Sequence, residues 1–270
     1  MDDTRWRLEE IPEDKPNPAR MYDYFLGGHH NFAVDRAAAD RVRSVYPDVV
    51  HGAQANRAFL RRVVRFMGEQ GIDQFLDLGS GIPTAGNVHE VAQRANPAAR
   101  VVYVDVEPVA VIHSAAILRG NERATIVEAD ARQPEEILKH PEVQRLLDFS
   151  KPIGVLMLAL LHFVTDDQAA QALVRRYREA LVPGSFIAIT HASLERVPAE
   201  IVTQFERVYS QTTTPIKTRG RAQVEPLFKG LDLVDPGVIY VPLWRPEGPD
   251  DVFLDQPERS INLGGVGRVR

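Results

Sequence analysis

Short runs of β-forming residues alternate with stretches of helical spacing from Gln74 onward, and this alternation constrains the fold more than any other feature. The runs are QFLDL, RVVYVDV, ATIVEA, PIGVLML and SFIAIT. Amphipathic stretches of about 10–15 residues follow most of them. Such alternation is typical of βαβ units, and the continuous apolar run VLMLALL suits a strand buried on both faces. The sequence therefore predicts an α/β fold around a mainly parallel sheet.

Signals for the starts of helices support these units. Pro108 and Pro134 stand where a first-turn proline is well tolerated, and Thr165 with Gln168 predicts a capping box. After Ser193 the pattern indicates another helix. It is followed by GLDLVDPGVIYVPLW, which we interpret as two closing strands that are joined at Pro236-Gly237 and form an antiparallel edge.

The first quarter of the chain has helical apolar spacing. Gly71 is placed as a helix stop after Gln70. Gly27-Gly28 would end an earlier helix that begins after Pro18, and Asn31 or Asp35 could cap the next one. We therefore expect a helical cap over residues 1–66 and a Rossmann-like domain over residues 67–270.

Composition excludes several classes of protein. The 270 residues include no cysteine, which excludes disulfides, thiolate zinc sites and cysteine nucleophiles. A net charge of −5 argues against a phosphate-binding surface, so no nucleic-acid partner is expected. The acidic N-terminus does not resemble a signal peptide, and no apolar run approaches the roughly 20 residues that span a bilayer. We expect a cytoplasmic protein without a membrane partner; oligomeric state is not predictable.

A glycine-containing loop, FLDLGSGIPTAGN, follows the first predicted strand. Gly79 and Gly81 permit a sharp turn and close approach of the backbone to a ligand. A nicotinamide-binding loop would have a third glycine where Thr84 stands, and Asp77 would repel its pyrophosphate. S-adenosylmethionine carries a sulfonium and an ammonium group but no phosphate. The loop therefore favours this cofactor over a dinucleotide.

Two further acids follow the next two predicted strands. Asp105 ends the strand in VVYVDVEP, where a carboxylate can accept both ribose hydroxyls. Asp130 in VEADA could accept a hydrogen bond from the adenine amino group. The alternative is that these glycines and aspartates only form turns, as they often do at strand ends. The informative feature is that each of three successive strands has an acid at its end.

These motifs resemble the class I S-adenosylmethionine-dependent methyltransferases between about Gln74 and Ser193, through DLGSG, VDVEP, EADA, LALLHFV and LVPGSFIAI. More narrowly, NPARMYDYFLGGHHNFAVDR, GLDLVDPG, PLWRP and GGVGR resemble a family called S-adenosyl methyltransferases. The commonest glycine loop has a third glycine where this chain has Pro83.

The resemblance implies a seven-stranded sheet of order 3-2-1-4-5-7-6. It also implies transfer of a methyl group from S-adenosyl-L-methionine to an unidentified acceptor, with release of S-adenosyl-L-homocysteine. We expect this acceptor to be a small molecule. The implied cofactor-binding residues are Tyr22, Gly28, Asp77, Gly79, Ser80, Gly81, Asp105, Val106, Asp130, Ala131 and Leu158.

Two histidines follow predicted strands. His162 is the leading candidate for a general base because it follows the fourth strand at the edge where open α/β sheets bind ligands. The alternative is a packed core histidine. His191, after the fifth strand, is a weaker candidate on the same argument.

Other polar clusters have simpler interpretations. Arg57, Arg61, Arg62 and Arg65 recur at helical spacing and are interpreted as a solvated helix face. The adjacent His29 and His30 suggest a metal, but neighbours in an extended segment point to opposite sides and no second ligand pair is suitably spaced. No metal is expected.

The segment YDYFLGGHHNFAVDR, residues 22–36, is interpreted as a lid over the cofactor. Its alternative is an ordinary helix-loop-helix. For the whole chain, two other functions remain open: a non-catalytic S-adenosylmethionine-binding module, and a nicotinamide-dependent oxidoreductase, against which Asp77 and Thr84 argue.

Overall fold

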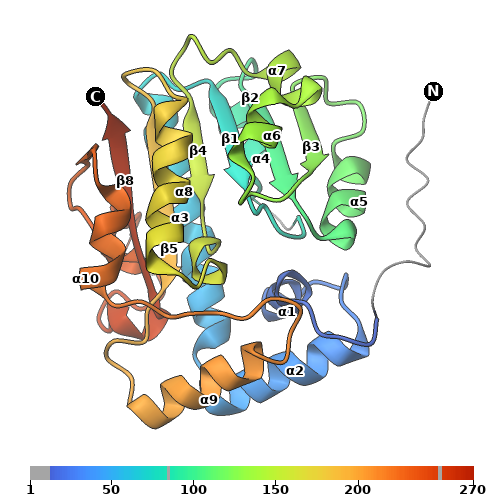
Figure 1. The fold of residues 1–270 in the computed structure, drawn as a ribbon, viewed down its shortest axis with the longest axis vertical. Helices are drawn as coiled ribbons and strands as arrows, with labels where there is room; N and C mark the ends of the chain where they lie inside the picture. Colours follow the sequence, from blue (N-terminus) through green and yellow to red (C-terminus); the bar gives the residue numbers. More distant parts are fainter. Residues whose placement is uncertain (1–12, 84–85, 249–250) are drawn as a thin grey trace.

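A twisted sheet with helices on both faces occupies one part of the computed structural model, and helices α1, α2 and α9 cover one end of it (Figure 1). The structure describes residues 13–83, 86–248 and 251–270. The strands are β1 (Gln74–Leu78), β2 (Arg100–Asp105), β3 (Ala124–Glu128), β4 (Gly154–Met157), β5 (Phe186–Ala192), β6 (Leu231–Leu233), β7 (Ile239–Tyr240) and β8 (Asn262–Val269).

Helices connect the strands as the alternating pattern predicts. The α-helices are α1 (Pro18–Phe25), α2 (Ala33–Val45), α3 (Val49–Glu69), α4 (Val88–Ala95), α5 (Pro108–Ile117), α6 (Pro134–Lys139), α7 (Pro141–Leu146), α8 (Asp167–Glu179), α9 (Ala199–Tyr209) and α10 (Arg221–Val224). The 3-10 turns are η2 (Leu161–Phe163), η3 (Glu225–Phe228), η4 (Val241–Leu243) and η5 (Pro257–Ser260).

The sheet has the order β3-β2-β1-β4-β5-β8-β6, and β7 also pairs with β8. Strands β1 to β5 are parallel, whereas β8 is antiparallel to β5, β6 and β7. The predicted order is confirmed, with β8 in the place of the seventh strand. The parallel strands therefore end at one edge, and Figure 1 shows β1, β3 and β4 pointing toward the helices of the cap.

The predicted antiparallel edge is present, but the prediction that its two strands are joined directly as a hairpin at Pro236-Gly237 is wrong. Strands β6 and β7 each pair with β8 and are not paired with each other. The intervening strand β8 contains Gly264, Gly265 and Gly267, and glycine is a weak strand former. A Cβ at Gly264 would lie 2.9 Å from Val241, and one at Gly267 would lie 2.8 Å from Leu231. Close packing of neighbouring chain segments therefore requires these glycines.

Alternation along β1 assigns its side chains to the two faces of the sheet. Leu76 and Leu78 pack in the apolar cluster that contains α6, α7 and α8. Phe75 belongs to the opposite cluster, with α3, α4 and the buried Trp244. Because side chains two positions apart share a face, Asp77 lies on the face covered by α3.

The cap has its own apolar cluster. It joins Met21 and Phe25 of α1, and Val42 of α2, to Phe205 and Tyr209 of α9. Figure 1 shows α2 and α9 side by side beneath the carboxyl ends of the strands. Thus α9, from the second half of the chain, completes the cap that the sequence assigned to residues 1–66 alone. The predicted boundary at residue 66 falls within α3, whose later turns pack on the sheet.

Several helix ends follow the sequence signals. Pro108 and Pro134 begin α5 and α6, and α3 ends at Glu69, before Gly71 with a φ of 88°. The capping box at Thr165 is wrong, because Asp166 is the N-cap of α8 and accepts from the Ala169 nitrogen at 2.7 Å. For α2, the Asp35 carboxylate accepts from the Phe32 nitrogen at 2.8 Å. Within the described residues, no helix is both long and apolar enough to span a membrane.

Candidate active site

A cavity of about 240 Å³ lies between the carboxyl ends of the strands and the cap. The loops after β1, β2, β3 and β4 form one side of it, and α1, the first half of α3 and α9 form the other. Ten of the eleven predicted cofactor-binding residues line the cavity: Tyr22, Asp77, Gly79, Ser80, Gly81, Asp105, Val106, Asp130, Ala131 and Leu158. His162, the predicted base, lines it too.

The glycine loop turns back sharply after β1. Gly79 and Gly81 have φ values of 69° and 67°, in the left-handed region that favours glycine. The Gly79 nitrogen donates to the Val104 carbonyl at 2.8 Å, and a Cβ at Gly79 would lie 2.7 Å from Leu160 Cδ1. The Ser80 hydroxyl is buried without a hydrogen-bond partner in the described part of the chain. The loop therefore permits close approach of the backbone to a ligand.

Asp77 is a buried acid at the end of β1, with a side chain only 5% exposed. Its carboxylate forms no hydrogen bond within the residues that the structure describes. Burial raises the pKa of Asp77 to about 7, an effect that the positive charge of Arg57 opposes and the negative charge of Asp105 reinforces. A buried carboxylate that lacks a hydrogen bond, beside a cavity, is suited to bind a cationic group.

Asp105 fixes the glycine loop to the end of β2. One of its oxygens accepts from the Gly81 nitrogen at 2.7 Å, and the other accepts from the Glu107 nitrogen at 2.8 Å. Burial raises the pKa of Asp105, and these N–H donors lower it. Val106, between the two acids, is 61% exposed at the cavity rim. Each carboxylate oxygen has a second lone pair, which remains for a ligand hydroxyl.

Asp130 lies beyond β3, and its carboxylate is already paired. Its two oxygens accept from Arg132 Nε and Nη2 at 2.9 and 2.6 Å, and this hydrogen bonding lowers the pKa of Asp130. The neighbouring Ala131 carbonyl accepts from the Tyr177 hydroxyl at 2.9 Å. Arg132 also lines the cavity. The third acid is therefore less free to accept from a ligand than Asp77.

The two predicted histidines lie in different places. His162, 6% exposed, lines the cavity, and its Nδ1 lies 3.5 Å from the Ala192 nitrogen. Burial holds the pKa of His162 well below its usual value, helped by His191 and Arg219. His191 does not line the cavity: its Nε2 lies 2.8 Å from Arg219 Nη1, and burial lowers its pKa to about 4. Only His162 is placed to face a ligand.

The segment interpreted as a lid contributes Tyr22 to the cavity wall but not Gly28. The Tyr22 hydroxyl donates to the Ala53 carbonyl and accepts from Asn56 Nδ2, both at 3.1 Å, so α1 is bound to α3. Gly28 is not among the residues that line the cavity. A Cβ there would lie 2.0 Å from the Asp23 carboxylate, so this glycine permits close packing within the cap.

The arginines of α3 do not form one solvated face. Arg62 is 5% exposed and donates to the carbonyls of Trp244 and Val241 at 2.9 and 2.7 Å, so the prediction is wrong for this residue. Because the partners of Arg62 lie about 180 residues further along the chain, the local sequence gave no sign that this arginine would be buried. Arg57 is half-buried and lines the cavity, whereas Arg65 is exposed. Arg57 was therefore missed as a candidate site residue.

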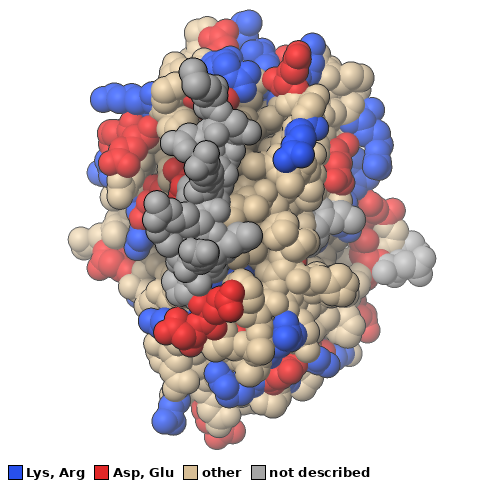
Figure 2. Space-filling model, turned by 90° about the vertical axis from the view of Figure 1, so that its right-hand side faces the viewer, with Lys and Arg blue, Asp and Glu red and all other residues tan. Residues whose placement is uncertain are grey.

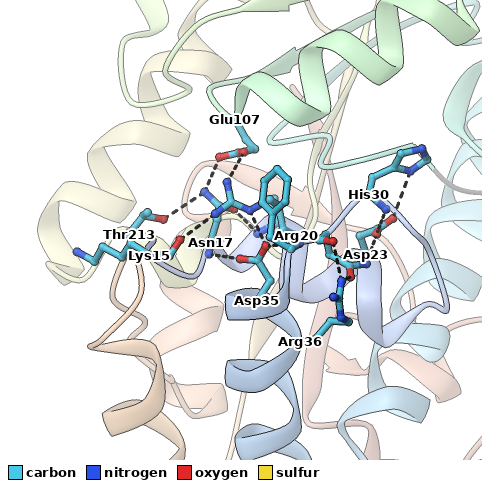
Figure 3. A network of polar contacts seen from close by, with 12 residues as sticks. Lys15, Asn17, Arg20, Asp23, His30, Asp35, Arg36, Glu107 and Thr213 are labelled. Atoms are coloured by element: carbon cyan, nitrogen blue, oxygen red, sulfur yellow. Dashed lines mark hydrogen bonds and ion pairs between the residues drawn. The ribbon is translucent and has the colours of Figure 1, made fainter. Parts of the chain in front are cut away.

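A buried polar network attaches the cap to the sheet (Figure 3). Arg20 Nε donates to Asp35 Oδ2 at 2.8 Å, and Arg20 Nη1 donates to Glu107 Oε1 at 3.0 Å. Asn17 Nδ2 also donates to Glu107, at 2.6 Å, and to Thr213 Oγ1 at 3.2 Å. Helices α1 and α2 are thus connected to the β2–α5 loop, two residues beyond Asp105.

The described residues hold no group of three or more histidine, cysteine, aspartate or glutamate side chains arranged for a metal. His29 is exposed, and the His30 ring contacts the His113 ring at a tilt of 45°, with centroids 3.7 Å apart. Positive and negative side chains are interspersed on the face shown in Figure 2.

The model of one protein family, described as S-adenosyl methyltransferase, matches residues 4–270. The chain belongs to the S-adenosyl methyltransferase family. A Thermobifida fusca YX protein, described as a candidate methyltransferase, has 39% identity and a TM-score of 0.90 over 99% of this chain and 100% of its own. A DUF574 family protein from Streptomyces avermitilis MA-4680 has 36% identity and a TM-score of 0.91, over 96% of this chain and 99% of its own.

Human N-acetylserotonin methyltransferase, solved in complex with S-adenosylmethionine, has 16% identity and a TM-score of 0.50 over 94% of this chain and 63% of its own, which shows the shared fold alone. No curated protein sequence matches the chain. Family membership confirms the predicted class I methyltransferase fold and S-adenosyl-L-methionine as the cofactor. The nicotinamide alternative is therefore wrong. Pro83 is described in the glycine loop, whereas Thr84 lies outside the described residues.

Proposed function

We propose that this S-adenosyl methyltransferase is an enzyme that methylates a small molecule held in the cavity beneath the cap. The observation that carries the proposal is the buried carboxylate of Asp77 at the end of β1, which has no hydrogen-bond partner among the described residues. In water-excluded surroundings, this acid gains from a cationic group more than from any neutral one. The same cavity extends beyond the strand ends to the cap, where we place the acceptor.

The predicted cofactor residues have complementary tasks. Asp77 would bind the ammonium group of the cofactor, Asp105 its ribose hydroxyls and Asp130 its adenine amino group. Arg57, whose positive charge acts on Asp77, would form an ion pair with the cofactor carboxylate. The bound cofactor supplies a methyl group that its positive sulfonium activates. The chain therefore has to orient the two molecules and exclude water, rather than generate a strong nucleophile.

His162 is the side chain that would receive a proton from the acceptor. It faces the cavity and is neutral at pH 7, because burial holds its pKa well below the usual value. The low pKa makes it a weak base, so we expect it to assist rather than to control the reaction. The cap around the cavity would exclude water.

The proposal is tested by formation of S-adenosylhomocysteine. The purified protein is incubated with S-adenosylmethionine and either the low-molecular-mass or the macromolecular fraction of a cell extract. We expect product with the low-molecular-mass fraction and little with Asp77→Asn. Product with the macromolecular fraction alone would contradict a small-molecule acceptor. Bound S-adenosylmethionine without product in either fraction would instead support a non-catalytic binding module.

A further inference from the structure

The cavity wall is divided by charge. Its charged residues are Arg57, Asp77, Asp105, Glu107, Asp130 and Arg132, five of which lie at or just after the carboxyl ends of β1, β2 and β3. The part of the wall beneath the cap belongs to the apolar cluster that joins α1, α3 and α9. We call this part the cap chamber and define it by Phe25, Val49, Phe163, Phe205, Tyr209 and Ile216.

The cap chamber has no charged side chain among the six residues that define it. The charged side chains of the described cavity wall lie at or just after the ends of β1, β2 and β3, apart from Arg57 in α3. A carboxylate or ammonium group placed there would lose its hydration without gaining an ion pair, at a large cost in free energy. Phe25, Phe163, Phe205 and Tyr209 instead provide aromatic surface, which favours a ring.

Tyr209 provides the polar group of this chamber. The residue is 8% exposed, and its hydroxyl has no hydrogen-bond partner within the part of the chain that the structure describes. This hydroxyl is not among the fully buried polar atoms, and Tyr209 lines the cavity. The nearby Tyr22 hydroxyl, by contrast, is occupied by Asn56 and Ala53. Tyr209 is therefore free to donate to a ligand and to accept from it.

We propose that the cap chamber binds the methyl acceptor and that this acceptor is an uncharged aromatic molecule with a hydroxyl group, positioned by the Tyr209 hydroxyl. The inference rests on the proposed function, because it names the substrate class of the same cavity. A hydroxyl on the ligand matches Tyr209, since each group can both donate and accept. The aromatic side chains of the chamber favour a ligand with a ring, and the lack of charged side chains among its six residues favours an uncharged ligand.

Three probes with the same ring system test this assignment. The protein is saturated with S-adenosylhomocysteine and titrated with 2-naphthol, naphthalene or 2-naphthoate. We expect 2-naphthol to bind at least about tenfold more tightly than 2-naphthoate, because the carboxylate lacks an ionic partner. Tyr209→Phe should weaken 2-naphthol binding by about 3–10-fold and leave naphthalene binding unchanged. The matched control is Tyr240→Phe, because the Tyr240 hydroxyl contacts Glu195 and the residue does not line the cavity.

The outcomes separate the inference from the proposed function. Binding of S-adenosylhomocysteine, measured first for wild type and both variants, should be unchanged by either substitution. Failure of the wild type to bind it would contradict the proposed function. If it binds normally, equal affinities for 2-naphthol and 2-naphthoate, or no binding of 2-naphthol, would overturn the inference alone. The wild-type comparison of probes remains decisive even if Tyr209→Phe does not fold.

Discussion

Arg20 Nη1 donates to Glu107 Oε1 at 3.0 Å, across the boundary between the cap and the sheet. Arg20 is 1% exposed and also pairs with Asp35 at 2.8 Å, so a single buried guanidinium binds α2 and the β2–α5 loop together. Because Glu107 follows Asp105 by two residues, the cap is attached directly beside the predicted ribose site. The stability of the cap and the shape of the site are therefore connected.

Glu107→Gln should destabilise the protein by about 1–3 kcal/mol, because Arg20 loses a buried anionic partner while the volume of the side chain is kept. The free energy of unfolding in urea measures the effect. Asp40→Asn is the control: its partner Arg43 lies at 3.5 Å in an exposed pair, for which about 0–1 kcal/mol is expected. Equal stability of the two variants would show that the network contributes nothing to attachment of the cap.

Asp77 should make the protein less stable as pH rises. Its pKa is about 7 in the folded state, against an ordinary value of 3.8, so between these two pH values the folded state holds a proton that the unfolded state has lost. Stability is therefore lost between about pH 4 and pH 7, at roughly 1.4 kcal/mol for each unit of pKa difference. Asp77→Asn should remove this loss and be the more stable protein above pH 7.

Thermal unfolding at about pH 5 and about pH 8 checks this prediction for wild type, Asp77→Asn and the control Asp73→Asn. The control replaces a carboxylate immediately before β1. Wild type and the control should lose stability in parallel, whereas Asp77→Asn should lose less. Parallel profiles for all three proteins would mean that Asp77 ionises normally in the folded protein.

Asp105→Ala should weaken cofactor binding by about 1.5–3 kcal/mol, because it deletes charge-assisted hydrogen bonds to the ribose. The structure adds a second reason, since the same carboxylate accepts from the Gly81 nitrogen at 2.7 Å and fixes the glycine loop. Calorimetric titration with S-adenosylhomocysteine measures the change, with circular dichroism as the check on folding. Unchanged affinity would remove Asp105 from the site.

Residues 18–36 should exchange backbone hydrogens more slowly when the cofactor is bound, because Tyr22 lines the cavity and its helix covers the strand ends. Hydrogen exchange with and without S-adenosylhomocysteine measures this effect. Peptides from the middle of α8 serve as the internal control. Indifference of residues 18–36 to the ligand would show that this segment only packs against the domain and is not a lid.

The parts of the fold that the sequence revealed are those with local signals. The end of each parallel strand fixes where Asp77, Asp105 and Asp130 lie, and all three line one cavity. Strand β8 had no such signal, because its Gly264 and Gly267 are required by neighbours that approach only in the folded chain.

Long-range packing explains the site residues that were missed. Tyr209 reaches the cavity because α9 packs against α2, an association between helices far apart in the sequence. Arg57 has the same helical spacing as exposed Arg65, and only the tertiary structure shows that one lines the cavity and the other does not. Gly28 was predicted to bind the cofactor but does not line the cavity. Its close neighbour is the Asp23 side chain.

Calorimetric titration of the purified protein with S-adenosylmethionine, S-adenosylhomocysteine and NAD tests the central claim, that the acids at the strand ends form a cofactor site. We predict that S-adenosylmethionine or S-adenosylhomocysteine binds with micromolar or better affinity, that Asp77→Asn binds more weakly, and that NAD does not bind. Tight binding of NAD together with no binding of S-adenosylmethionine would contradict the account.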